Sequence, residues 1–121
     1  MQPLPFKKLI VALTAMKGRE NTKPIKRLKH LLTKGNLWLY ILSIIRQRKR
    51  IHAYALDDAI EQEFSFRPNK IMVYIVLYKL EGERLIRSEY EKRRRYYQLT
   101  PKGREALGDA KTYFQALTKK L

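Results

Sequence analysis

The chain has 121 residues, no cysteine, and a formal net charge of +16 from 27 lysines and arginines against 11 aspartates and glutamates. This length predicts a single domain, and an apolar content of 45% is enough to build a compact core. The lack of cysteine excludes disulfides and thiolate metal sites. A surface this positive repels itself unless a polyanion neutralises it. The composition therefore favours nucleic acid as the partner over an anionic membrane surface or a merely solubilising charge.

No apolar run approaches the length of about 20 residues that crosses a bilayer. The longest runs cover residues 9–16 and 37–45. Residues 6–17 faintly resemble a signal peptide, but their apolar part is short and the cleavage context is poor, so we interpret them as a helix of the mature protein. We expect no membrane association and a cytoplasmic, nucleoid-associated protein.

The first half of the chain predicts helices separated by short polar breaks. After the helix at 6–17, residues 24–33 place apolar side chains at three- and four-residue spacing with lysines outside, which is typical of an amphipathic helix. Residues 34–36 predict a helix stop, followed by Asn36 as the N-cap of the next helix. That helix, 37–48, is almost entirely apolar at first, so we expect it at the centre of the core.

The end of this helix carries a cluster of positive side chains. Two interpretations are equally good: a solvated helix terminus that the helix dipole favours, or a set of phosphate contacts. The residues concerned are Arg46, Arg48, Lys49 and Arg50.

The middle of the chain predicts two further helices joined by a turn. Residues 52–64 read as a helix, residues 65–67 as a turn, and Pro68 as a helix start. Residues 69–82 are rich in β-branched and aromatic side chains and are consistent with a buried strand. Their length, Pro68 and two apolar rows at helical spacing favour a helix. The rows are Tyr74, Leu77 and Leu80, and Ile71, Ile75 and Tyr78.

The most informative stretch is a strongly basic hairpin. Residues 85–90 and 95–99 have strand character and flank a tip at 91–94 that is rich in lysine and arginine. Thr100 and Pro101 then predict the N-cap and first turn of a final helix. A cationic hairpin after a helix in a small basic protein is typical of a nucleic-acid-binding wing.

The final helix carries an apolar stripe that continues almost to the last residue. The stripe either folds back on its own domain or forms a dimer interface, and we favour the dimer because monomers rarely leave long apolar stripes exposed. The predicted interface residues are Leu107, Ala110, Tyr113, Phe114, Leu117 and Leu121, joined by Leu28 and Leu32 of the earlier amphipathic helix.

These elements predict a mainly α fold with a small β-hairpin (α+β). We expect the architecture of a winged helix-turn-helix with extra N-terminal helices and a long C-terminal dimerisation helix. We divide the chain into an N-terminal helical extension at 1–34, a winged-helix DNA-binding domain at 35–100 and a dimerisation helix at 101–121.

Three segments resemble the PadR-type winged-helix transcriptional regulators. Residues 52–56, His-Ala-Tyr-Ala-Leu, are similar to the family's His-Gly-Tyr-Glu-Leu. Residues 74–86 are similar to its Tyr-x-x-Leu-x-x-Leu-Glu-x-x-Gly-Leu-Ile segment, and residues 95–104 to its Arg-x-Tyr-x-Leu-Thr-x-x-Gly close of the wing. The resemblance covers about residues 35–107. It implies a dimeric transcriptional regulator, most often a repressor, and some relatives respond to small aromatic or cationic ligands.

The chain departs from that pattern at three positions. Ala53 and Ala55 replace a glycine and a glutamate. Arg84 replaces the glycine before Leu-Ile, and a left-handed backbone there would be strained in an arginine.

A recognition helix reads base edges with its N-terminal residues in the major groove. Asparagine pairs with adenine, lysine or arginine with guanine, and valine contacts a thymine methyl. The exposed face here is poor in polar groups, so we expect modest base readout and a large backbone or shape component. The candidates are Arg67, Asn69, Lys70, Val73 and Tyr74. Asn69 has an alternative as a plain helix-start residue.

The wing supplies a second set of candidates that enter the minor groove or grip phosphates, with a solvated turn as the alternative. They are Lys92, Arg93, Arg94, Arg95 and Tyr96. Strand alternation places Tyr97 and Leu99 in the core. We expect double-stranded DNA and a second copy of the chain as partners.

Other functions find less support. A sequence-tolerant architectural DNA-binding protein is the main alternative, and an RNA-binding or protein-interaction module is the third. No catalytic motif or cofactor loop is visible, so we expect neither an enzyme nor a cofactor. Acidic residues near His52 are better explained by the helix dipole than by a metal site. A small aromatic effector is a further candidate partner, with core packing as the alternative role for its candidate residues Trp38, Tyr40, Tyr113 and Phe114.

Overall fold

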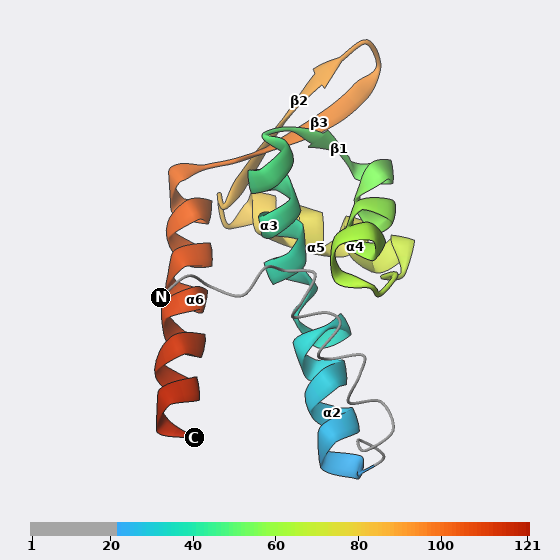
Figure 1. The fold of residues 1–121 in the computed structure, drawn as a ribbon. Helices are drawn as coiled ribbons and strands as arrows, with labels where there is room; N and C mark the ends of the chain where they lie inside the picture. Colours follow the sequence, from blue (N-terminus) through green and yellow to red (C-terminus); the bar gives the residue numbers. More distant parts are fainter. Residues whose placement is uncertain (1–21) are drawn as a thin grey trace.

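The computed structural model describes residues 22–121. The predicted helix at 6–17 lies outside this range. Figure 1 shows the central helices gathered in the middle of the molecule, the hairpin projecting from one end, and α2 and α6 extending toward the other. None of the helices in the described part of the chain is long and apolar enough to span a membrane. The elements are α2 (Lys23–Leu32), α3 (Leu37–Arg48), β1 (Ile51–His52), α4 (Leu56–Phe64), α5 (Lys70–Gly82), β2 (Ile86–Glu91), β3 (Arg94–Leu99) and α6 (Pro101–Lys120).

The predicted fold class is confirmed, with α3 at the centre of the core. Ile41, Leu42, Ile44 and Ile45 of α3 are fully buried, and the helix contacts α4, α5, α6 and β3. A helix that is apolar around most of its circumference must be covered on several sides, which explains this position.

Asn36 is the N-cap residue of α3, as predicted, but its side chain makes no hydrogen bond to the backbone N–H groups in the first turn of the helix. Its Oδ1 accepts a hydrogen bond from Trp38 Nε1 at 3.2 Å, and its Nδ2 donates to the carbonyl of Leu31. The side chain therefore ties the end of α2 to the start of α3.

The sheet has a strand that the sequence pattern did not reveal. β1 pairs with β3 through Ile51↔Tyr97 and His52↔Tyr96, which gives the antiparallel order β1-β3-β2. The helix predicted from residue 52 begins only at Leu56, after a 3₁₀ turn at 53–55. A strand of two residues is too short to show an alternating pattern, and its pairing partner lies far along the chain.

The ambiguous segment 69–82 is a helix, as predicted, but it starts later and faces differently than expected. Pro68 precedes the N-cap Asn69, whose Oδ1 accepts from the backbone N–H groups of Ile71 at 2.8 Å and Met72 at 3.3 Å. Its buried residues are Val73, Leu77 and Leu80. Leu77 and Leu80 belong to one of the two predicted rows, whose third member Tyr74 is exposed, and the other row, Ile71, Ile75 and Tyr78, is entirely exposed.

The predicted hairpin is present, and its turn is tight. Strands β2 and β3 pair from Ile86↔Leu99 to Glu91↔Arg94, so Lys92 and Arg93 alone form the loop. Their φ angles are 51° and 68°. Positive φ at both central residues defines a type I′ turn, which favours Asn-Gly. Here two cations occupy it instead.

The start of α6 is fixed against the hairpin. Thr100 is the N-cap, as predicted, because its Oγ1 accepts from the backbone N–H of Gly103 at 3.0 Å. The same hydroxyl donates to the carbonyl of Arg84 at 2.7 Å. A Cβ on Gly103 would lie 2.1 Å from the carbonyl oxygen of Leu85, so only glycine allows this approach.

Arg84 adopts the left-handed conformation expected of the glycine it replaces, with φ 62°. We expect Arg84→Gly to raise the free energy of unfolding by about 1 kcal/mol, because glycine removes the steric cost of that backbone. Urea denaturation measures the change. Glu83→Gly is the matched control. Glu83 has φ −88°, which needs no glycine, so this substitution should lower the free energy of unfolding. Equal destabilisation by both substitutions would contradict this account.

Candidate nucleic-acid interface

Helices α4 and α5 form a helix-turn-helix pair joined by residues 65–69. Ser65 ends α4 in the left-handed conformation, with φ 62° and its N–H bonded to the carbonyl of Glu61. The second helix of such a pair is the one that enters the major groove. The helix in that position here is α5, and we call it the recognition helix for its place in the pair.

The cations predicted at the start of the recognition helix are partly neutralised by α4. Arg67 contacts Asp57 at 3.1 Å and Asp58 at 2.6 Å, with Glu61 at 3.6 Å, and Lys70 Nζ lies 3.8 Å from Asp57. The hydrogen bond with Asp58 raises the pKa of Arg67, so the guanidinium stays charged. Arg67 and Lys70 therefore anchor α5 to α4, which reduces the charge they can offer to a phosphate.

Asp57 is the buried centre of this cluster, with a relative exposure of 3%. We expect Asp57→Asn to lower the free energy of unfolding by roughly 1.5–3 kcal/mol, since it removes a charged hydrogen-bond partner of Arg67. Asp58→Asn removes the same charge from a side chain that is 64% exposed, and should cost about 1 kcal/mol or less. Urea denaturation compares the two, and an equal cost would argue against the anchoring role of Asp57.

The acidic residues of α4 do not form a metal site in the described part of the chain, where no group of three or more metal-ligating side chains comes together. Three of these carboxylates face Arg67 instead.

Two residues predicted to contact DNA from the recognition helix have other roles in the structure. Val73 is 1% exposed, so it belongs to the core and cannot reach a base. The side-chain oxygen of Asn69 caps α5, which matches the plainer interpretation of this residue. Of the predicted set, Tyr74 lies on the exposed face at 47% exposure.

The wing separates its cations into free and anchored groups. Lys92 and Arg93 are exposed at the turn and make no ion pair with the described residues, and Arg94 lies 5.5 Å from the ring of Tyr54. Arg95 is anchored: its guanidinium contacts Glu81 of α5 at 2.5 Å and donates to Ser88 at 2.9 Å. Arg95 thus fixes the wing relative to the recognition helix.

The cations at the end of α3, which were predicted to contact phosphates, also fall into an exposed group and an anchored residue. Arg46, Arg48 and Lys49 are exposed, whereas Arg50 pairs with Glu91 and lies 4.0 Å over the ring of Tyr96. Arg50 therefore connects the end of α3 to both strands of the wing, through Glu91 of β2 and Tyr96 of β3.

A hollow of about 290 Å³ lies between the wing and the recognition helix. It brings Tyr74 of α5 next to Arg93, Arg94 and Arg95, and its floor includes Tyr97. Burial raises the pKa of the Tyr97 phenol, which therefore stays neutral. Its remaining lining residues are His52, Ala53 and Tyr54.

His52 and Tyr54 were not predicted as site residues. Their rings stack at a centroid distance of 3.9 Å beside Tyr96. The missed strand β1 carries His52 to this position, so no pattern in the sequence could have located it.

The predicted dimer residues largely converge on one groove of about 710 Å³ between α6 and the α2–α3 junction. Three of them do not line it. Leu107 is buried in its own chain at 5% exposure and is not available to a partner. Leu28 and Leu121 are exposed but do not line the groove. The predicted residues that line it are Leu32, Ala110, Tyr113, Phe114 and Leu117.

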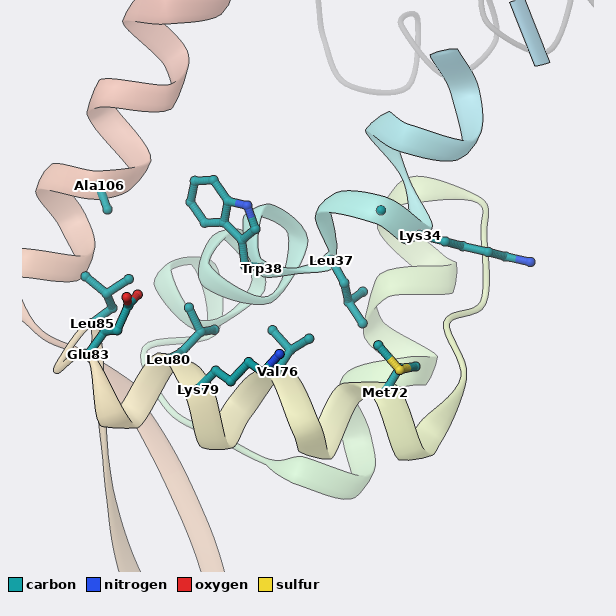
Figure 2. A pocket seen from close by; sticks show the side chains of 11 residues that line it. Lys34, Leu37, Trp38, Met72, Val76, Lys79, Leu80, Glu83, Leu85 and Ala106 are labelled. Atoms are coloured by element: carbon teal, nitrogen blue, oxygen red, sulfur yellow. The ribbon is translucent and has the colours of Figure 1, made fainter. Parts of the chain in front are cut away.

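A second cavity, of about 400 Å³, lies between α3, α5 and α6. Figure 2 shows Met72 and Val76 of α5 pointing toward Leu37 and Trp38 of α3. Of the four aromatic residues considered for an effector, Trp38 lines both this cavity and the groove, and Tyr113 and Phe114 line the groove. Tyr40 instead packs edge-on against Phe64 and Phe66.

The geometry of a helix-turn-helix followed by a cationic wing agrees with the comparisons. The profile described as "Transcriptional regulator PadR-like family" matches residues 41–109. The chain belongs to the PadR-like family of transcriptional regulators. The match spans α3 to the first half of α6, which includes the recognition helix and the wing.

Solved structures support the same fold. A PadR family regulator from Clostridium difficile R20291 is 25% identical, with a TM-score of 0.61 over 68% of this chain and 90% of that one. A PadR family regulator from Eggerthella lenta DSM 2243 is 22% identical, with a TM-score of 0.68 over 79% and 87%. F93 from STIV, a winged-helix DNA-binding protein, is 18% identical, with a TM-score of 0.61 over 69% and 90%. The comparison with curated proteins found no match.

Proposed function

We propose that this PadR-like protein is a sequence-specific repressor that binds double-stranded DNA in the nucleoid as a homodimer. The observation that carries the proposal is the hollow in which Tyr74 of the recognition helix meets the arginines of the wing. A duplex lying across this hollow would contact α5 through its major groove and the wing through its phosphates or minor groove. The net charge of +16 supplies the long-range attraction.

The dimer part of the proposal rests on the groove between α6 and the α2–α3 junction. Tyr113 and Leu117 remain 67% and 42% exposed in the single chain, on a helix segment with little else to pack against. A two-fold dimer would place two recognition helices about one DNA turn apart, roughly 34–36 Å, and would require a palindromic site.

A sequence-tolerant architectural protein is the second candidate function. The exposed face of α5 supports it, because that face offers few polar groups for base edges. Binding would then depend mainly on phosphates and DNA shape.

A small aromatic effector remains part of the proposal. The cavity of about 400 Å³ has apolar walls that include Trp38, and its charged lining residues are Lys34, Lys79 and Glu83, which suits a flat molecule with a polar group at its rim. Trp38 is the single tryptophan of the chain, so binding should change its fluorescence.

Fluorescence anisotropy tests the main proposal. The purified protein is titrated with its own upstream DNA and with a shuffled duplex of equal length, at about 50 and 200 mM salt. A preference of roughly a hundredfold that survives the higher salt would establish a site-specific regulator. Equal and steeply salt-dependent binding would favour the architectural function, and effective competition by RNA would favour an RNA-binding protein.

A further inference from the structure

The recognition helix presents an apolar stripe to solvent. Ile71, Tyr74, Ile75 and Tyr78 follow the i, i+3, i+4, i+7 spacing of one helix face and are 69%, 47%, 42% and 82% exposed. Val73, Leu77 and Leu80 bury the opposite face in the core. The position that should meet base edges is therefore occupied by aliphatic and aromatic side chains.

The polar groups near this stripe are already engaged. The Oδ1 of Asn69 accepts two backbone hydrogen bonds, so the amide cannot pair bidentately with adenine without losing its cap. Lys70 Nζ lies 3.8 Å from the buried carboxylate of Asp57. Of the groups on the stripe itself, the hydroxyls of Tyr74 and Tyr78 are the ones that can hydrogen-bond to a base.

The positive charge around the stripe favours DNA as the molecule that covers it. Tyr74 shares a hollow with Arg93, Arg94 and Arg95, and Lys79 is exposed on the same helix. A second copy of this face would bring like charges together, whereas a polyanion is complementary to the frame of cations. An apolar strip inside a cationic frame matches the floor of a major groove between two phosphate backbones.

The one apolar group on the major-groove edges of the four base pairs is the C5-methyl of thymine. We propose that Ile71 and Ile75, with the rings of Tyr74 and Tyr78, read thymine methyl groups, so that the protein prefers A·T-rich sites with methyls along the groove. This inference rests on the proposed function, since it names the sequence class that the recognition helix selects. Burial of one methyl corresponds to about a fourfold gain in affinity, so four methyls in a two-fold site give on the order of a hundredfold.

Replacement of thymine by deoxyuridine tests the proposal directly. An A·T-rich duplex of about 30 base pairs is compared with the same duplex carrying uracil at every thymine position, which leaves pairing and phosphate charge unchanged. We expect at least tenfold weaker binding to the uracil duplex. In a G·C-rich duplex, replacing cytosine by 5-methylcytosine should restore part of the affinity, because it presents a methyl in the same groove.

The variant Ile71→Ala/Ile75→Ala should discriminate less between thymine and uracil duplexes than the wild-type protein, with an unchanged salt dependence, because two of the four methyl-reading side chains are removed. Leu31→Ala is the matched control: Leu31 is an exposed leucine of α2, 45% exposed, and its truncation should leave the discrimination intact. Both stripe positions are exposed, so circular dichroism should show an unaltered fold.

Three outcomes would overturn the inference. Equal binding of the wild-type protein to thymine and uracil duplexes would leave a DNA-binding regulator that does not read methyls. A change in the sedimentation of the free protein caused by Ile71→Ala/Ile75→Ala would identify the stripe as an interface between copies. Failure to bind any duplex would contradict both the proposed DNA-binding function and the recognition of thymine methyls by α5.

Discussion

Replacement of the wing turn by Asn-Gly, as Lys92→Asn/Arg93→Gly, should yield a protein that is more stable and binds DNA less tightly. Both residues have positive φ, 51° and 68°, in a type I′ turn for which Asn-Gly is the preferred sequence. Relief of the left-handed backbone should raise the free energy of unfolding by about 1–2 kcal/mol. Loss of two cations from each wing, four in the proposed dimer, should lower affinity by about tenfold or more and reduce the slope of log affinity against log salt by roughly 3.6.

The opposite signs of the two effects make the test sharp. Weaker binding cannot be ascribed to unfolding if urea denaturation shows a more stable protein. Lys119→Gln/Lys120→Gln is the matched control, because it removes the same charge from the last turn of α6, away from the wing. If anisotropy titrations gave the same loss and the same change in salt slope for both variants, the wing would contribute only to overall charge.

The parts of the fold that depend on local chemistry could be predicted from the sequence. Thr100 and Pro101 specify the start of α6 through a side-chain cap and a proline in the first turn, and both effects act within a few residues. The hairpin followed from two short strands around a basic turn. The strand at Ile51–His52 could not be found, because its one partner, β3, is more than 40 residues away in the chain.

The candidate site shows that a pattern of charges in the sequence is not enough to tell which cations can face DNA. Arg67, Lys70 and Arg95 counted as DNA-facing cations in the sequence, but each contacts a carboxylate of α4 or α5 in the fold. Conversely, Ile71 and Ile75 looked like core residues because both sides of α5 are apolar. When two rows of a helix are equally hydrophobic, periodicity alone cannot say which row is buried, and the packing of α3 against Val73 and Leu77 decides it.

The second large effect is expected at the groove beside α6. Leu117→Asp should convert the proposed dimer to a monomer, because it places an unpaired charge in the apolar groove lined by Tyr113 and Phe114. Dimer affinity should fall by at least about a hundredfold. Binding to a palindromic duplex should fall by roughly 10²–10⁴, since the second half-site no longer gains from the first. Sedimentation velocity and anisotropy measure the two effects.

Thr112→Asp is the matched control for this variant. It introduces the same charge on the same helix, at an exposed position of α6 that does not line the groove, so the dimer should persist. The two positions differ in what surrounds the new carboxylate, which is apolar side chains at residue 117 and solvent at residue 112. A Leu117→Asp protein that still sediments as a dimer would exclude this groove as the contact between protomers. A wild-type protein that sediments as a monomer would leave each recognition helix to bind DNA alone and would remove the requirement for a palindrome.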